Sequence, residues 1–245
     1  GVASVEIEPL PAPAPSLEEE IYRRLRDLIV SGDLVPGALY SMNELATQLR
    51  VSRTPVAQAV TRLVDHGMVR VEHRRGMRIL ETSTHDLAEI YEMRLLLEPR
   101  AAYRAATLMR KVEHRRLREA LTALRRVTDV LNNPREHLRC DAAFHRVILQ
   151  ASGNRRLANY VDSLRDLQMI RGASTADKTR PLSDVVADHE AIYRHIVAGD
   201  APGAAHEMHQ HILLTCNLLI EQETGAASVL LGPPWPAPAD TEPLT

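Results

Sequence analysis

The spacing of apolar residues along this 245-residue chain changes twice, and these changes constrain the fold more than any other feature. From Ser16 to His66, apolar residues recur every three or four positions, which predicts short helices. Two brief alternations of apolar and other residues follow, at Met68–Val71 and Met77–Leu80, and they predict a β-hairpin. From Thr84 onward the helical spacing returns and no segment has the pattern of a strand. We therefore expect a mainly α protein with one hairpin.

Residues 16–81 have the plan of a winged helix-turn-helix domain. The pattern Ser-x-x-Glu begins the first two helices, at Ser16 and Ser41, and Ser52 caps the third. A tight turn separates the second and third helices, and the hairpin then turns at the basic tip 73–76. Three short helices and a hairpin within about 65 residues are typical of this DNA-binding motif. The alternative is a small structural α+β unit.

The helical spacing of apolar residues in 84–223 predicts an all-helical bundle. Asn133–Pro134 and Arg180–Pro181 are typical helix starts, because proline is tolerated in the first turn. The short connections between the helices favour an antiparallel arrangement. The predicted helices lie near residues 84–109, 113–131, 134–151, 154–171, 181–198 and 201–223.

Both ends of the chain lack this periodicity. Residues 1–15 and 224–245 are rich in proline, and we expect a disordered arm and a Pro-rich disordered tail. No apolar run approaches the ~20 residues that span a bilayer, and no signal-peptide pattern is present. Cys140 and Cys216 fit neither a disulfide framework nor zinc-finger spacing. These features favour a cytoplasmic protein with no membrane partner.

The charge balance restricts where an anionic partner can bind. The formal net charge is -2, which excludes a surface that is basic all over. The segment from Ser41 to Leu80 nevertheless holds seven Arg and three acidic residues. A nucleic acid is therefore expected to meet a local basic patch in this segment.

Several motifs of the chain resemble those of the GntR family of bacterial transcription regulators. The similarity rests on Val51-Ser-Arg-Thr-Pro-Val56, preceded by Leu34-Val-Pro-Gly37 and Asn43-Glu-Leu-Ala46. The helical part is similar to the FadR-type C-terminal ligand domain, the FCD domain, at Asp141-x-x-Phe-His145, Gly153–Asn154, Asp188–His189 and His211. The resemblance implies a homodimer that binds an inverted-repeat operator, acts as a repressor and responds to an effector. The chain departs from the family at Asn43 and at Ala57–Gln58, so its operator sequence is expected to differ.

Seven residues are predicted to contact DNA. Ser52 and Thr54 lie at the start of the recognition helix, where backbone N–H groups and the helix dipole favour a phosphate. The planar fork of Arg53 matches O6 and N7 of guanine, a contact worth about 1–3 kcal/mol of discrimination. Arg74 and Arg75 at the hairpin tip suit the minor groove or flanking phosphates, and Gly76 permits the tight turn. A solvated turn is the alternative for this tip. The predicted set is Asn43, Ser52, Arg53, Thr54, Arg74, Arg75 and Gly76.

Four residues form a candidate metal site. Asp141 and His145 are four positions apart, so on a helix they share one face, and His189 and His211 lie on the last two predicted helices. Three imidazoles and one carboxylate suit a first-row transition metal rather than Ca²⁺ or Mg²⁺. Hydrogen-bonded core histidines are the alternative that the spacing leaves open. The resemblance implies that all four match metal-binding positions, with zinc as the first expectation and nickel or manganese as the others.

Arg94 is the candidate effector-binding residue. The resemblance implies that it faces the ligand cavity, and the alternative is a surface pair with Glu98 four positions later. A metal beside a guanidinium binds a carboxylate well, so the expected effector is a small organic acid. The alternatives are a metal-dependent hydrolase with a DNA-binding head and a metal-free regulator that senses an acyl ligand. The chain has no nucleophile motif or phosphate loop, so we expect no enzyme activity.

Overall fold

The computed structural model describes residues 16–130, 134–172 and 180–225, which form two compact units that divide between Glu81 and Thr82. The predicted arm 1–15 and residues 226–245 of the predicted tail lie outside the described residues. Among the described helices, none has the length and apolar character needed to cross a membrane.

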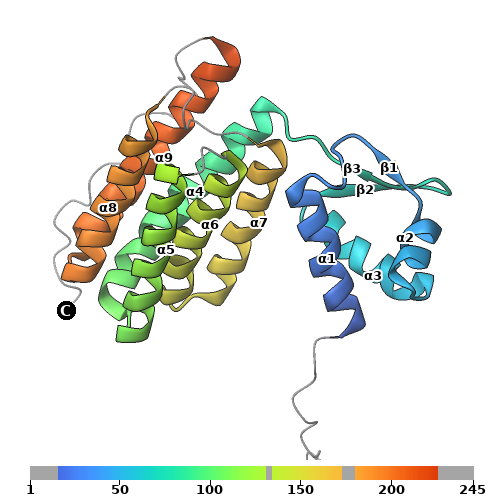
Figure 1. Cartoon of the computed structure of the whole chain (residues 1–245), viewed down its shortest axis with the longest axis horizontal. Helices are drawn as coiled ribbons and strands as arrows, with labels where there is room; N and C mark the ends of the chain where they lie inside the picture. Colours follow the sequence, from blue (N-terminus) through green and yellow to red (C-terminus); the bar gives the residue numbers. More distant parts are fainter. Residues whose placement is uncertain (1–15, 131–133, 173–179, 226–245) are drawn as a thin grey trace, which may run out of the picture. The chain divides into compact units, whose positions relative to one another are not determined.

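The first unit is a winged helix-turn-helix with a small antiparallel sheet (Figure 1). Ser16 and Ser41 cap their helices as predicted, each accepting a hydrogen bond from the backbone N–H three residues later. The sheet order is β1-β3-β2, with Leu39 opposite Arg78. The strand β1 was not predicted, because two residues carry no period. The elements are α1 Leu17–Ser31, β1 Leu39–Tyr40, α2 Met42–Leu49, α3 Arg53–Asp65, β2 Val69–Glu72 and β3 Gly76–Ile79.

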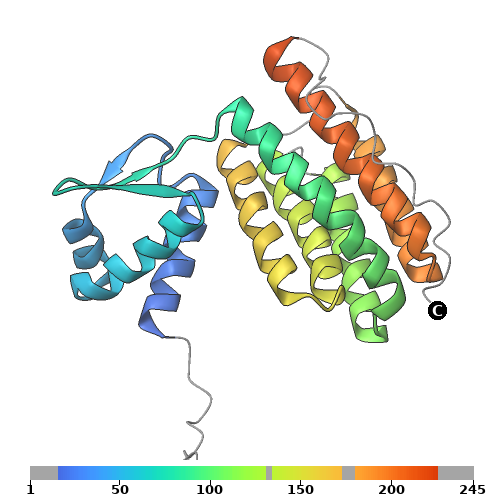
Figure 2. The same cartoon turned by 180° about the vertical axis from the view of Figure 1, so that it is seen from behind.

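The second unit is a helical bundle, as predicted (Figure 2). A full capping box begins α4, since Ser83 and Asp86 each accept a hydrogen bond from the other's backbone N–H. Left-handed glycines end α7 and α8, at Gly172 and Gly199. The helices are α4 Thr84–Leu108, α5 Lys111–Val130, α6 Pro134–Ala151, α7 Arg155–Arg171, α8 Leu182–Ala198 and α9 Ala201–Thr224.

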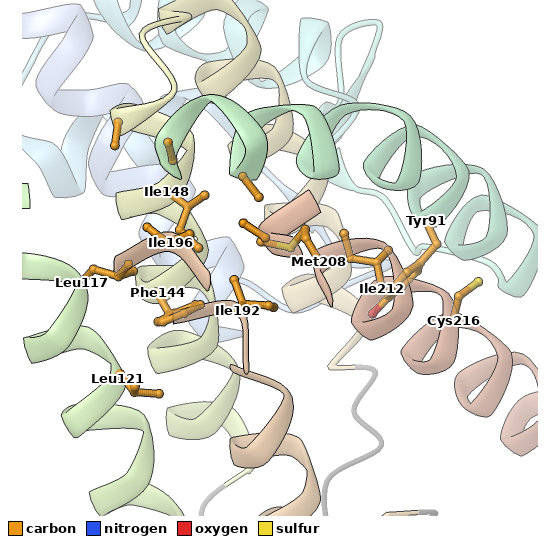
Figure 3. Close-up of a cluster of buried hydrophobic side chains, with 14 of the residues drawn as sticks. Tyr91, Leu117, Leu121, Phe144, Ile148, Ile192, Ile196, Met208, Ile212 and Cys216 are labelled. Atoms are coloured by element: carbon orange, nitrogen blue, oxygen red, sulfur yellow. The ribbon is translucent and has the colours of Figure 1, made fainter. Parts of the chain in front are cut away.

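Helix α4 is central to the bundle, because it packs against α6, α7, α8 and α9. The apolar core joins α4, α5, α6, α8 and α9, and Phe144, Ile192 and Met208 are completely buried in it. Figure 3 shows Tyr91 reaching from α4 toward α9, beside Ile212. A buried polar cluster that includes Glu98, His145 and His189 lies next to this core, beside Phe144.

Candidate functional site

The first unit presents a groove of about 400 Å³ between the starts of α2 and α3 and the hairpin. Five of the seven residues predicted to contact DNA line it, and Ser52 and Thr54 stand exposed beside it at the start of α3. The structure therefore gathers the predicted residues on one surface, although they come from three separate elements. The lining residues are Ser41, Met42, Asn43, Arg53, Val71, Glu72, His73, Arg74, Arg75 and Gly76.

The start of α3 offers donors rather than acceptors. Ser52 occupies the N-cap position, but its side chain makes no capping hydrogen bond, which corrects the expectation that it caps the helix. No acidic residue lies in the first turn of α3, so no negatively charged side chain there neutralises the positive end of the helix dipole. Arg53 and Thr54 are exposed there. An uncapped, basic helix start is a favourable place for a phosphate.

The hairpin tip is shaped by a close backbone approach. Gly76 has a φ of +138°, and a Cβ atom placed on it would lie 2.1 Å from the carbonyl oxygen of Tyr40. Gly76 is therefore required by the packing of β1 against β3 as well as by the turn, where Arg74 takes the left-handed conformation with a φ of 60°. Nη1 of Arg75 lies 3.0 Å from Oε2 of Glu72 and forms an ion pair with it, whereas Arg74 makes no ion pair within the described part of the chain. Arg74 is thus the tip cation that is available to an anion.

In the second unit, the four predicted metal ligands come together. Asp141 and His145 lie on α6, His189 on α8 and His211 on α9. One ligand atom from each side chain lies within 4.8 Å of the others. The three histidines are buried, and the Asp141 side chain is 14% exposed. The helix spacing alone could place only Asp141 and His145 on one face, so the fold supplies the rest.

Each histidine of the cluster forms a hydrogen bond through its Nδ1 atom with a residue outside the cluster. Nδ1 of His145 lies 2.5 Å from a Glu98 carboxylate oxygen, and Nδ1 of His189 lies 2.7 Å from the Val185 carbonyl oxygen. Nδ1 of His211 lies 3.2 Å from a carboxylate oxygen of Asp188. Ionised carboxylates and carbonyls only accept hydrogen bonds, so Nδ1 carries a proton in each ring, and a neutral ring then has its lone pair on Nε2. This arrangement is typical of metal-binding histidines.

The Nε2 atoms of His145 and His189 lack adequate hydrogen-bond partners. Nε2 of His145 is buried and has no hydrogen-bond partner among the described residues. Nε2 of His189 lies 2.9 Å from Oδ1 of Asp141. If Nδ1 of His189 donates to Val185, both of these atoms are acceptors, and two acceptors at that distance need a proton or a cation between them. The donor set therefore fits a metal ion and can hold one.

A buried ionic network adjoins the cluster. Arg94 donates from Nε to Glu98 over 2.6 Å and from Nη1 to Gln168 over 2.7 Å. Arg165 on α7 contacts Asp141 and lies 3.4 Å from Glu98. The pair of Arg94 with Glu98 therefore exists, but the alternative that placed it on the surface was wrong, since both side chains are at most 3% exposed. Sequence reasoning missed Arg165 and Gln168 because nothing in their spacing marks them.

Burial and ion pairing set the protonation of the cluster. Burial, together with the Arg165 charge, lowers the pKa of His145 to about 3. Burial and the neighbouring His189 also lower the pKa of His211. Burial tends to raise the pKa values of Glu98 and Asp141, but Arg94 beside the first and Arg165 beside the second hold them well below their usual range. Neutral imidazoles and an ionised carboxylate are the forms that bind metal.

Comparison with known proteins gives matches over both units. The family model "Bacterial regulatory proteins, gntR family" matches residues 17–79, and the FCD domain model matches residues 89–214. The chain is 24% identical over 198 residues to the uncharacterized HTH-type transcriptional regulator YdhC of Bacillus subtilis, covering 81% of this chain and 87% of that protein. It is 28% identical over 193 residues to a probable D-xylose utilization operon transcriptional repressor of Paenarthrobacter nicotinovorans, covering 77% and 84%. Among solved structures, E. coli McbR/YncC superposes with a TM-score of 0.73 at 22% identity, covering 85% of this chain and 99% of the other.

Proposed function

Since this chain belongs to the gntR family of bacterial regulatory proteins and carries an FCD domain, we propose that it is a repressor whose operator affinity is set by a small organic acid bound at a metal in the bundle. The family consists of DNA-binding transcription regulators and not enzymes, so the alternative of a metal-dependent hydrolase is set aside. The observation that carries the proposal is that one ligand atom each from Asp141, His145, His189 and His211 lies within 4.8 Å of the others in the bundle.

The residues that would hold the metal are Asp141, His145, His189 and His211. We propose zinc, with nickel or manganese as the other outcomes of metal analysis, because three imidazoles and a carboxylate suit these ions. A bound metal would supply a positive charge that attracts an effector carboxylate. Glu98 and Asp188 would orient His145 and His211 through their Nδ1 atoms.

For DNA binding, we propose a homodimer on an inverted repeat, because one winged helix reads only a few base pairs. Arg53 would read a base in the major groove, and Ser52 and Thr54 would bind a phosphate at the start of α3. The exposed, unpaired state of Arg53 and Arg74 within the described residues supports these roles.

Coupling between effector and operator requires a path from the cluster to the DNA-binding unit, and α7 offers one. Arg165 of α7 contacts Asp141, and six residues later Arg171 donates to the Thr82 carbonyl oxygen and to Oγ1 of Thr84. Thr82 is the first residue of the second unit, and its hydroxyl donates to the α7 carbonyl oxygen of Leu167 over 3.1 Å. A shift of α7 on effector binding would therefore move the segment that leads into the DNA-binding unit. Such coupling needs the effector to bind the two arrangements unequally.

The test combines metal analysis with DNA binding by the full chain. We expect elemental analysis to find about one transition-metal ion per chain, lost in His189→Ala. Fluorescence anisotropy with DNA upstream of the protein's own gene should show tight binding with a steep salt dependence. An organic acid should weaken this binding only when the protein contains the metal. Arg53→Ala should weaken this DNA binding. Arg115→Ala, which removes an exposed arginine from α5, is its matched control and should leave DNA binding unchanged. A metal-free protein that responds to acyl ligands would refute the metal part, and saturation of the bundle with unchanged DNA affinity would refute the coupling.

A further inference from the structure

Glu72 is the only acidic side chain among the described residues that line the groove of the DNA-binding unit. It is the last residue of β2, next to the basic tip 73–76, and its side chain is 17% exposed. The lining also carries three arginines, Arg53, Arg74 and Arg75. Because a carboxylate repels the phosphates of DNA, Glu72 opposes the binding that these arginines favour.

Three arginines surround the Glu72 carboxylate. Its Oε1 atom accepts a hydrogen bond from Nε of Arg78 over 2.5 Å, and Nη1 of Arg78 donates to the Gly37 carbonyl oxygen over 2.6 Å. Nη2 of Arg70 lies 3.5 Å from the same Oε1 atom, whereas Nη1 of Arg75 lies 3.0 Å from Oε2. The hydrogen bond from Arg78 lowers the pKa of Glu72, so the carboxylate is ionised at neutral pH.

The two oxygens of Glu72 face different tasks. Arg70 stands opposite Arg78 across the β2–β3 pair, and like charges directly opposite each other destabilise a sheet. Oε1 contacts both of these arginines and offsets their repulsion. Oε2 accepts no hydrogen bond from the described residues, so its contact with Arg75 is held by charge alone. The Arg75 side chain is 66% exposed, and it can exchange this contact for one with a phosphate.

We propose that Glu72 is a specificity-determining residue that limits how many phosphates the hairpin binds. It keeps Arg75 paired within the protein and leaves Arg74 as the tip cation that contacts DNA. The inference rests on the DNA-binding part of the proposed function and is independent of the metal and the effector. Phosphate contacts carry no sequence information, so fewer of them leave a larger share of the affinity to base contacts. Glu72 thereby weakens binding to DNA of arbitrary sequence.

The test is fluorescence anisotropy of the full chain with a duplex of mixed sequence, at salt concentrations from about 50 to about 200 mM. Glu72→Gln keeps the shape of the side chain and removes its charge. We expect it to bind the duplex about fivefold more tightly at the lowest salt concentration, because Arg75 becomes free to bind a phosphate. One added phosphate contact steepens the slope of log K against log salt by about 0.9, so the gain should shrink about 3.5-fold over this range. Asp65→Asn, which removes an exposed carboxylate from the other end of α3, is the matched control and should keep the wild-type affinity.

A second comparison does not depend on the folding of Glu72→Gln. In the otherwise wild-type protein, Arg74→Gln should reduce the salt slope by about one. Arg75→Gln should reduce it by less than half as much, because Arg75 is already paired with Glu72. In the Glu72→Gln background the two substitutions should reduce the slope equally.

The outcomes separate this inference from the proposed function. Unchanged binding by a Glu72→Gln protein that is folded by circular dichroism would overturn the inference. Weaker binding would also overturn it, since Glu72 would then contact DNA itself. Equal losses on Arg74→Gln and Arg75→Gln in the wild-type background would overturn the assignment to Arg75. A wild-type protein that binds no DNA at any salt concentration would overturn the proposed function together with the inference.

Discussion

Glu98→Gln is the substitution that tests the buried network most directly. The Glu98 side chain is 1% exposed and accepts hydrogen bonds from Arg94 Nε at 2.6 Å and from His145 Nδ1 at 2.5 Å. Glutamine has nearly the same shape, so little packing is lost. It has no charge, however, and its amide nitrogen donates where Glu98 accepts. Either Arg94 or His145 would then face another donor, and the network would carry an uncompensated positive charge.

The expected cost follows from the burial of the pair. Removing one partner of a buried ion pair destabilises a protein by about 3–5 kcal/mol. For a domain of this size, roughly 2–4 °C of melting temperature is lost per kcal/mol, so the bundle should melt roughly 6–20 °C lower. Loss of the group that orients a ligand histidine also lowers metal affinity about 10–100-fold. Both effects should appear together.

The assay is thermal unfolding in chelator, followed by a zinc competition titration. Glu190→Gln is the matched control, because Glu190 pairs with Arg125 at 2.7 Å but is 39% exposed. Exposed pairs contribute about 0–1 kcal/mol, so this control should melt within a few degrees of the wild type. If Glu98→Gln melts like the control and binds zinc as tightly as the wild type, the reasoning about the buried network is wrong.

Three further substitutions or conditions test other parts of the structure. Arg53→Ala should weaken operator binding by about 1–3 kcal/mol in an anisotropy titration, and unchanged affinity would exclude the base contact. Gly76→Ala should lower the melting temperature of the first unit in circular dichroism, because its Cβ would meet the Tyr40 carbonyl at 2.1 Å, and a wild-type melt would contradict that approach. In metal-stripped protein, His145 has a folded pKa of about 3, below its usual 6.5, so the unfolded chain binds the proton first and stability falls with pH below 6.5. The fall from pH 7 to 5 should be about 2 kcal/mol in urea titrations, and a flat profile would contradict a neutral, buried His145.

Local signals were sufficient to predict most of the fold. Ser16 and Ser41 predicted helix starts because a serine oxygen at this position accepts a hydrogen bond from a free backbone N–H of the first turn. This interaction is local and requires no tertiary contact. The strand Leu39–Tyr40 could not be predicted, since it exists only by pairing with β3 far along the chain. The same pairing explains why glycine is required at position 76, because the backbone of Tyr40 leaves no room for a Cβ atom there.

The site was less accessible to sequence reasoning than the fold. Helix geometry placed Asp141 and His145 together, but His189 and His211 could be added only through resemblance to a family. Arg165 could not be found at all, because a charged residue on a helix is ordinarily exposed. Only the assembled bundle shows that it is 3% exposed and directed at Asp141. Long-range packing, and not local pattern, turns this arginine into part of the site.

The ion pairs of the network have a consequence for the order of folding and metal binding. In small zinc domains the metal supplies the folding energy, so the metal-free chain is unfolded. Here Arg165 already compensates Asp141, and Arg94 compensates Glu98, while a large apolar core joins five helices beside them. The bundle therefore has the means to fold before it meets a metal. Under the proposed function, a metal would therefore bind to a bundle that is already folded, beside ion pairs that are already formed.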